Sequence, residues 1–382
     1  MGRAIVVGGG ILGTLHAVEA HRRGWDVLQL DVDPEPQLAT VRNIGELWVS
    51  GRAPGLELDV ALRARELWRD LASRAPGMGF RAEGSLTIAT RTEHLAVFDQ
   101  VLTRGDAERR GLRFLPASVV AENFPIIRGE VLGALACRLD AVVEPRLTLP
   151  ALRELVGSDG TYEFLGGRQV WEVGPGQVID TTGKVHRGDI VLVCPGARPS
   201  TLATMVLGRA PLRRVRLQML QTAPLDERLG TIITDADALR WNPGYDVPAR
   251  SFLPPAPPVV EEFHVHLRCA QRSSGALTVG ETREYEEPFG FDLSERPFHH
   301  LTEALTALLG RELPPVTRRW DGVHHECTDG RLWYREAVDE GVFVVTGGGS
   351  RGLTLAPAIA EDTFSWIDDG IETGGARVRP AN

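Results

Sequence analysis

The chain carries two glycine-rich turns, one near each end, and both have the form of a ligand-binding turn. In the first, Gly8, Gly10 and Gly13 follow a short apolar run and open a helical pattern at 14–23. Asp31 follows at the end of a second apolar run. Such glycines let the backbone approach a pyrophosphate, the helix N-terminus attracts phosphate, and the acid accepts hydrogen bonds from a ribose hydroxyl. The spacing predicts a dinucleotide site, and the carboxylate disfavours NADP.

The second glycine turn, at 347–352, follows an apolar run at 341–346 and precedes a helical pattern at 355–367. A strand and a turn so late in the chain predict a return to the same sheet, whereas a nicotinamide enzyme of this fold keeps its cofactor domain compact and N-terminal. A further helix N-terminus beside the cofactor suits the negative charge of a reduced flavin. The pattern therefore favours FAD over NAD.

These turns belong to four separated segments that resemble the D-amino-acid-oxidase-type family of FAD-dependent oxidoreductases, which includes glycine and sarcosine oxidases. The four segments are 6–31, 39–48, 191–197 and 346–357. Shorter segments resemble a bacterial subgroup linked to aminophosphonate breakdown, whose members are similar to N-methylaminoethylphosphonate oxidases. Those shorter segments are 41–43, 143–146, 216–219 and 277–281.

The resemblance implies a mixed α/β (α+β) fold, in which a Rossmann-like FAD-binding domain is interleaved with a mixed-sheet substrate domain. The FAD-binding domain is expected from residues 1–80, 140–210 and 315–382, and the substrate domain from 81–139 and 211–314. Periodicity predicts helices at 56–75, 91–110, 146–156 and 298–309, and strands at 85–89, 169–173, 177–180, 189–194, 213–222 and 263–268.

The same resemblance implies the cofactor contacts. One group along the adenosine, the pyrophosphate and the ring comprises Gly8, Gly10, Ile11, Leu12, Gly13, Asp31, Val32, Arg42, Asn43, Gly45, Val170, Cys194, Pro195 and Gly196. A second group near the isoalloxazine comprises Gly322, Gly349, Ser350, Arg351, Gly352, Leu353 and Thr354.

An anionic substrate group needs a fixed cation, and in this chain that cation must be an arginine. Lys184 is the single lysine among 42 basic residues, and it lies in a turn expected far from the flavin. Arg351, within the second turn, and Arg268, in the predicted strand at 263–268, are the leading candidates. Arg351 has a solvated loop position as its alternative. Arg216 and Arg240 are weaker candidates.

His324 and His325 follow Gly322, where relatives carry an arginine or a tyrosine near the ring, so one of them is expected to line the substrate pocket. A loop position is the alternative for both. Trp48 could form a pocket wall or pack in the core. His264 and His266 have a spacing that could bind metal, but no third ligand is evident, so no metal site is predicted.

Composition narrows the remaining classes of protein. The net charge of −9 argues against a nucleic-acid partner. Four dispersed cysteines fit a reducing cytosol, and no apolar run is long enough to span a membrane, so a cytoplasmic location is expected.

The sequence thus predicts an FAD-dependent amine or amino-acid oxidase or dehydrogenase. Its substrate would be a small anionic amine of the amino-acid or aminophosphonate type, and its electron acceptor would be oxygen or another molecule. The amine would lose hydride to flavin N5, and the imine would hydrolyse to a carbonyl compound and an amine. The alternatives are a dehydrogenase or hydroxylase of another small metabolite, and a flavin-binding subunit without its own turnover.

Overall fold

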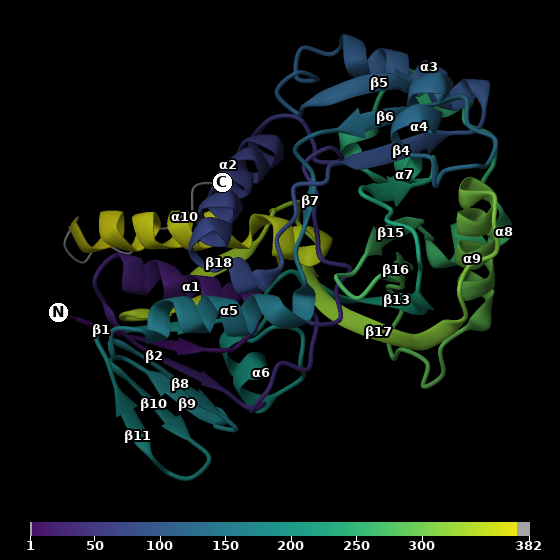
Figure 1. The fold of residues 1–382 in the computed structure, drawn as a ribbon. Helices are drawn as coiled ribbons and strands as arrows, with labels where there is room; N and C mark the ends of the chain where they lie inside the picture. Colours follow the sequence, from purple (N-terminus) through teal and green to yellow (C-terminus); the bar gives the residue numbers. More distant parts are fainter. Residues whose placement is uncertain (1, 373–382) are drawn as a thin grey trace.

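The computed structural model describes residues 2–372, and its two halves are each built on a large sheet (Figure 1). The first sheet has six strands in the order β18-β19-β12-β1-β2-β8. Its members are β1 (Arg3–Val7), β2 (Asp26–Asp31), β8 (Tyr162–Gly166), β12 (Ile190–Val193), β18 (Tyr334–Asp339) and β19 (Val342–Thr346). All neighbouring strands run parallel except β18 and β19. The return of a late strand to the N-terminal sheet, predicted from the second glycine turn, is confirmed.

Alternation along β1 gives this sheet two buried faces. Ala4 and Val6 pack towards helices α1 (Ile11–Arg22) and α10 (Gly352–Glu372). Ile5 and Val7 pack on the opposite face, against a small antiparallel sheet. That sheet consists of β9 (Val170–Gly174), β10 (Gln177–Asp180) and β11 (Val185–Arg187). Helix α5 (Pro145–Gly157) packs on α1, and α2 (Leu56–Arg74) packs against α10.

The second sheet has eight strands in the order β17-β13-β16-β15-β14-β4-β6-β5. Its members are β4 (Ser85–Ala89), β5 (Leu112–Pro116), β6 (Gly133–Cys137), β13 (Leu212–Pro224), β14 (Ile232–Thr234), β15 (Arg268–Gln271), β16 (Ala276–Gly280) and β17 (Val316–Cys327). A core of Leu220, Val279, Phe298 and Leu301 joins one face of this sheet to helix α9 (Glu295–Leu309). The fold is the mixed α/β arrangement that the sequence predicts.

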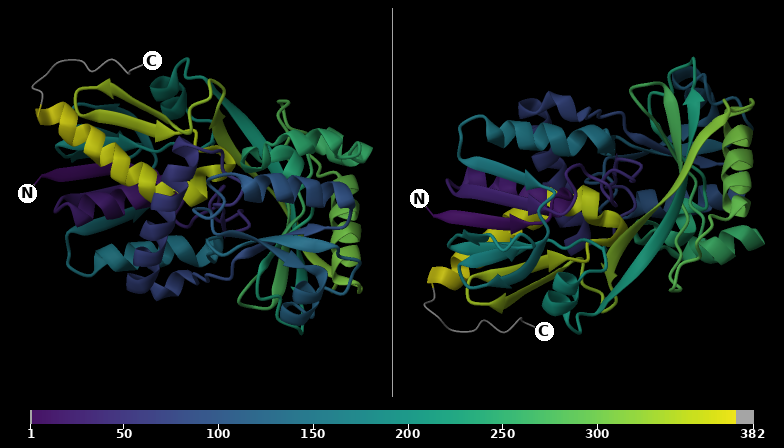
Figure 2. Two further views of the ribbon diagram at one scale, coloured as in Figure 1. Left: turned by 90° about the horizontal axis from the view of Figure 1, so that it is seen from above. Right: turned by 90° about the horizontal axis from the view of Figure 1, so that it is seen from below.

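Shorter helices and a two-stranded sheet complete the fold. They are α3 (Thr92–Thr103), α4 (Ala117–Asn123), α6 (Thr201–Leu207), α7 (Ala238–Trp241), α8 (Pro258–Phe263), β3 (Glu46–Leu47) and β7 (Ala141–Val142). Strands β13 and β17 are long, and they extend from one half of the molecule towards the other (Figure 2).

Two details differ from the sequence-based expectations. The strand expected at 263–268 begins only at Arg268, because His264 takes a left-handed conformation (φ 45°) at the end of α8. His264 and His266 therefore do not share a strand face. The helix expected at 91–110 ends at Thr103. Strand β17 pairs along its length with β13, so both strands belong to the second sheet.

Candidate functional site

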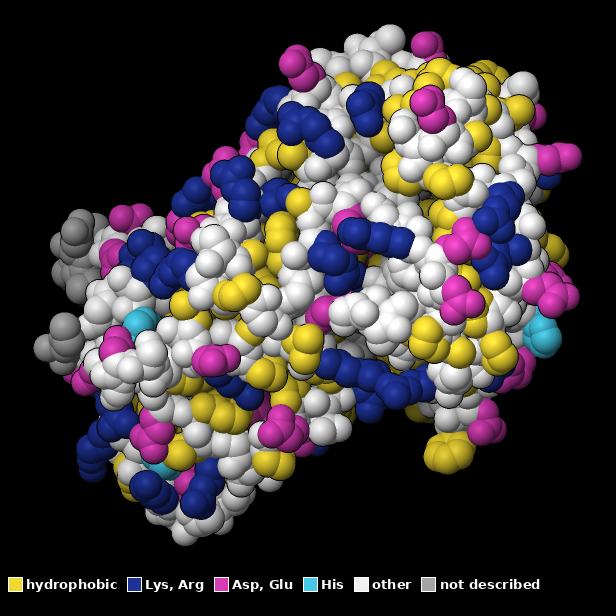
Figure 3. Space-filling view, viewed as in Figure 1, with side chains coloured by type: hydrophobic (Ala, Val, Ile, Leu, Met, Phe, Trp, Pro, Cys, Tyr) yellow, Lys and Arg dark blue, Asp and Glu magenta, His cyan; other side chains and the backbone are white. Residues whose placement is uncertain are grey.

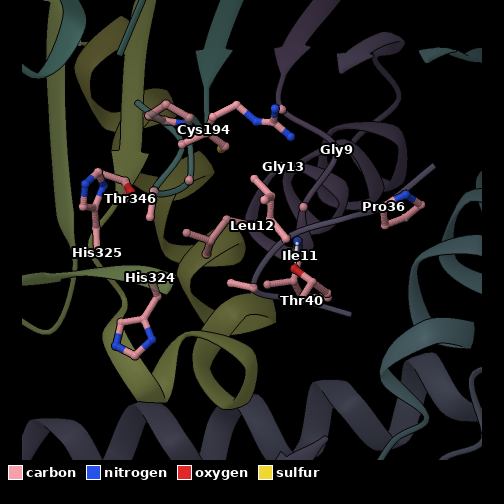
Figure 4. A pocket seen from close by; sticks show the side chains of 18 of the residues that line it. Gly9, Ile11, Leu12, Gly13, Pro36, Thr40, Cys194, His324, His325 and Thr346 are labelled. Atoms are coloured by element: carbon pink, nitrogen blue, oxygen red, sulfur yellow. Dashed lines mark hydrogen bonds between the residues drawn. The ribbon is translucent and has the colours of Figure 1, made fainter. Parts of the chain in front are cut away.

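A cavity of about 530 Å³ lies between the carboxyl ends of the first sheet and one face of the second. Its walls include both glycine turns and the β13–β17 ladder, from Leu217 and Met219 to His324. Figure 4 shows the labelled side chains of the first turn on one side and those of β17 on the other. The cavity therefore brings together residues from both ends of the sequence.

The first glycine turn has the shape that a pyrophosphate requires. Gly8 has φ +121°, and a Cβ on it would lie 2.2 Å from the carbonyl oxygen of Cys194. A Cβ on Gly13 would lie 2.0 Å from the carbonyl oxygen of Gly8. At Gly10 the nearest atom to such a Cβ is the Thr40 hydroxyl oxygen, at 3.5 Å, which is an ordinary van der Waals contact, and the residue lines the cavity. Two glycines are thus needed for packing, and the third leaves room for a ligand.

Asp31 joins the end of β2 to the glycine turn. One carboxylate oxygen accepts a hydrogen bond from the Gly9 amide, and the other accepts one from the Asp33 amide at 2.8 Å. Burial raises the pKa of Asp31 above its ordinary value, although these amide donors oppose the rise. The Gly9 carbonyl in turn accepts a hydrogen bond from Arg153 Nη2 at 2.8 Å. This network fixes the turn and leaves Asp31 on the cavity wall.

The segment 36–43 forms one side of the cavity and connects it to the second sheet. Thr40 Oγ1 accepts a hydrogen bond from the Ile11 amide at 3.0 Å (Figure 4). Arg42 Nη1 donates to the Asp321 carbonyl at 2.9 Å, and Trp320 Nε1 donates to the Arg42 carbonyl at 2.9 Å. Asn43 Oδ1 accepts from the Gly45 amide at 2.7 Å. These bonds fasten the loop to β17, so the two halves share one wall.

The second glycine turn closes the middle of the cavity. Strand β19 ends at Thr346, and Gly347 and Gly349 take φ values of +76° and +58° before α10 begins. The N-terminus of this long helix therefore lies at the cavity, beside Cys194–Gly196 at the end of β12. Helix N-termini favour negative charge.

Most of the expected cofactor residues and both expected histidines line the cavity. Those that line the cavity are Gly8, Gly10, Ile11, Leu12, Gly13, Asp31, Val32, Arg42, Asn43, Val170, Cys194, Pro195, Gly196, Gly322, Gly349, Ser350, Gly352, Leu353, His324 and His325. Gly45, Arg351, Thr354, Arg268 and Trp48 lie outside the lining.

Comparison with known proteins decides the family. The family model described as "FAD dependent oxidoreductase" matches residues 3–366, nearly the whole chain. The chain belongs to this family of FAD-dependent oxidoreductases. FAD is accordingly its cofactor. The cavity fits that group because it is lined by the glycine backbone, by two helix N-termini and by the carboxylate of Asp31.

Individual relatives are more distant. The chain is 28% identical over 228 residues to the tRNA 5-methylaminomethyl-2-thiouridine biosynthesis bifunctional protein MnmC of Maricaulis maris (strain MCS10). That match covers 53% of this chain and 37% of the relative, so the chain spans little more than a third of the curated relative that it matches.

Solved structures share the whole fold. Glycine oxidase from Bacillus cereus ATCC 14579 superposes with a TM-score of 0.78 at 15% identity, covering 97% of this chain and 96% of that one. Iminodiacetate oxidase from Chelativorans sp. BNC1 superposes with a TM-score of 0.72 at 20% identity, covering 99% and 97%. At these identities the likeness concerns the fold.

Beyond the cofactor walls, the structure gathers charged side chains around His324 at the second sheet. Burial, and after it the nearby Arg283, His325 and Arg351, together lower the pKa of His324 to about 3. Burial and then Arg214 likewise lower the pKa of His325. Both imidazoles are therefore neutral near pH 7, and they can donate or accept hydrogen bonds but carry no charge.

The two arginines that the sequence favours have different surroundings. Arg268 lies 3.1 Å from Glu46, and its guanidinium stacks 4.1 Å from the centre of the Trp48 ring. Arg351 has a looser partner, since its Nε lies 3.6 Å from Glu57. Arg52 lies equally far from the same carboxylate, and burial lowers the pKa of Arg52 to about 10. The single carboxylate of Glu57 thus faces two cations, so it cannot neutralise both Arg52 and Arg351.

The other residues expected at the site lie outside the cavity lining. Trp48 is buried, and its amide donates to Thr354 Oγ1 at 3.0 Å. Gly45 packs against Val143, whose carbonyl oxygen would lie 2.4 Å from a Cβ. The weaker candidates are engaged elsewhere, because Arg216 pairs with Glu284 and Arg240 pairs with Asp237. Over residues 2–372, no group of three or more His, Cys, Asp or Glu side chains is arranged to hold a metal ion.

Lys184 lies where the sequence predicts it, in the turn between β10 and β11, away from the cavity.

Three residues that sequence reasoning did not assign also have notable positions: Arg153, Arg283 and Glu281. Arg153 and Glu281 line the cavity. Glu281 ends the segment 277–281, which carries part of the subgroup resemblance, and that segment was the sequence signal that could have drawn attention to Glu281.

In the described part of the chain, no helix is long and apolar enough to cross a membrane.

Proposed function

We propose that this flavoprotein oxidises the C–N bond of a small amine that also carries an anionic group. The observation that supports this proposal is the set of arginines near His324, at the end of the FAD cavity that the second sheet closes. Arg283 and Arg351 are both near enough to His324 to depress its pKa. Their Nε atoms are buried and have no hydrogen-bond partner among residues 2–372. Buried polar groups normally have partners, so a ligand acid group would complete this arrangement.

Bound FAD supplies a hydride acceptor for the carbon next to the substrate nitrogen. The role of the protein is to fix the substrate in one orientation. Arg283 and Arg351 would hold the acid group, and neutral His324 would add a hydrogen bond. Leu217 and Met219, on the same face of β13, would exclude water from the reacting carbon. The imine product would hydrolyse in solution to a carbonyl compound and an amine.

Within this class, an aminophosphonate or an N-substituted amino acid is the proposed substrate. The segments 41–43, 143–146, 216–219 and 277–281 support the aminophosphonate type through their family resemblance. Two arginines would also match a phosphonate dianion better than one would. The electron acceptor would be oxygen or another molecule. Because Lys184 is remote, a cation that assists a reaction with oxygen would be an arginine, a histidine or the substrate itself.

Anaerobic titration tests the proposal. The purified protein should show a flavin absorption spectrum, and a panel of amines should bleach it. The panel contains N-methyl aminophosphonates, glycine, sarcosine, iminodiacetate and D-amino acids. Bleaching by acid-bearing amines, but not by simple alkylamines of the same length, is the expected result. If no amine bleaches the flavin while dithionite does, amine oxidation is not the function. The domain division and a cytoplasmic location remain predictions.

A further inference from the structure

Glu281 is a charged group on the cavity wall to which the proposed function gives no part. It follows β16 directly, is 7% exposed, and lines the cavity together with Met219 and His324. Its Oε1 atom is buried and accepts no hydrogen bond from the described residues. The nearest cation is Arg283 Nη2, at 3.6 Å, which is longer than a hydrogen bond. A buried carboxylate oxygen without a donor is costly, so this position calls for a donor from outside the chain.

The main chain holds this carboxylate in place. The amide of Glu281 donates to the His266 carbonyl at 2.5 Å, and the His266 amide donates to the Glu281 carbonyl at 2.7 Å. The next residue, Thr282, donates its amide to the Gln218 carbonyl at 3.4 Å. The backbone of Glu281 is therefore tied to the loop before β15 on one side and to β13 on the other. A side chain anchored in this way can serve as a fixed receptor.

The groups around Glu281 give the site two opposite charges. Arg283 faces it directly, and Arg268 and Glu46 interact with it electrostatically across the sheet. Burial lowers the pKa of both His266 and His324, so these neighbours are neutral. One side of this region therefore offers a carboxylate, and Arg283 with Arg351 offers guanidinium groups. A zwitterion complements this pattern, with its ammonium at Glu281 and its acid at the arginines.

We propose that Glu281 binds the ammonium group of the substrate and accepts one of its protons. This inference rests on the proposed function. An alkylammonium cannot lose hydride from its carbon, because the nitrogen lone pair that forms the C=N bond is occupied by a proton. In the proposed sequence, one N–H proton moves to the carboxylate of Glu281 and frees the lone pair. The adjacent C–H bond could then break as the C=N bond forms, and bound FAD would supply the acceptor for its hydride.

The proposal defines which molecules can react. A substrate needs at least one N–H bond and an acid group separated from the nitrogen by a short chain. Quaternary amines have no proton to transfer, so they would neither pair fully with Glu281 nor react. Simple acids would bind at the arginines without needing Glu281.

The test uses the FAD-loaded Glu281→Gln protein in three measurements. Anaerobic bleaching by the best substrate should show kcat/KM about 100-fold below wild type at pH 7, the scale of a lost charge-assisted hydrogen bond. The value for the variant should then rise about tenfold per pH unit towards the pKa of the free amine, since only neutral amine can react. The dissociation constant of an amine-free acid, ethylphosphonate or propionate, read from the flavin spectrum, should stay within about twofold of wild type.

Glu286→Gln makes the same chemical change on the exposed loop beyond the site and should match wild type. Glu281→Asp should restore much of the activity and the flatter pH profile. Equal loss of amine and acid binding in Glu281→Gln would mean a structural role and would overturn the proposal. So would an unchanged pH profile with unchanged kcat/KM. If the wild-type flavin is bleached by amines in either of those cases, the proposed function stands and only the role of Glu281 fails. If no amine bleaches the wild type, both fail.

Discussion

The two ends of the cavity offer different kinds of group to a ligand. At the first glycine turn, the walls combine backbone, from Gly8, Gly10 and the N-terminus of α1, with charged side chains such as Asp31 and Arg153. At the second sheet, the proposed recognition groups are long side chains: Glu281 and Arg283, two positions apart after β16, together with Arg351 from the second glycine turn. Figure 3 shows arginine side chains gathered where the two halves meet. Backbone geometry suits a ligand that never changes, whereas side chains can set specificity by substitution.

The sharpest test of the backbone end is Gly13→Ala. Its methyl group would lie 2.0 Å from the Gly8 carbonyl oxygen, so the turn must open. We expect FAD affinity to fall by more than about 100-fold, because several kcal/mol of strain would be added. Flavin content on purification and titration of the apoprotein measure this loss. Gly174→Ala is the matched control, since a Cβ there meets nothing within 4 Å. Normal FAD binding by a folded Gly13→Ala protein would contradict the assignment of the turn.

At the side-chain end, Arg351→Met should spare FAD but weaken the substrate. Loss of a charge-assisted contact predicts a fall in kcat/KM of about 10- to 100-fold for acid-bearing amines. Anaerobic stopped-flow bleaching gives this value, and flavin content shows whether the cofactor end is intact. Arg113→Met, on the exposed face of β5, should leave both unchanged. A variant that loses FAD and substrate in parallel would show that the two ends are not separable.

His324, at the second-sheet end of the cavity, should also make the free energy of unfolding sensitive to acid. The folded pKa of His324 is about 3 against an ordinary value of 6.5, so the unfolded chain takes up a proton that the folded chain refuses. Stability is therefore lost as pH falls below 6.5, by about 2 kcal/mol at pH 5. In His324→Gln, the drop in unfolding free energy between pH 7.5 and pH 5 should be smaller by that amount. Urea titrations at both pH values measure it. His299→Gln, on an exposed position of α9, should keep the wild-type pH dependence.

The smallest effect is expected for Lys184→Met. Lys184 lies in the turn between β10 and β11, outside both ends of the cavity. Flavin content, anaerobic bleaching and the rate of reoxidation by oxygen should all stay within about twofold of wild type. A large fall in the reoxidation rate alone would show that the single lysine assists the oxidative step after all.

Sequence reasoning located the backbone end more fully than the side-chain end. The strand–turn–helix of residues 3–22 and the late strand β19 were both predicted within a few residues. Arg268, Trp48 and Arg351, all expected at the substrate, lie outside the cavity lining, and Arg268 stacks on Trp48. The strand expected to present Arg268 starts later because α8 ends in a left-handed turn at His264. The sequence analysis gave Glu281 and Arg283 no role, because no local motif marks them. Their proposed role depends on neighbours that are distant in the sequence.

By itself, the sequence determined the family, the FAD cofactor and the glycine backbone that receives it, because those features depend on neighbours along the chain and on conformations that only glycine adopts freely. Composition also leaves Lys184 as the single lysine, so a fixed cation for an anionic substrate group must be an arginine. Only the tertiary structure shows that Arg283 and Arg351 lie near His324 and that Glu281 faces Arg283. That grouping depends on where the chain leaves β16 and on the register of β13 with β16 and β17, and these pairings join residues far apart in the sequence.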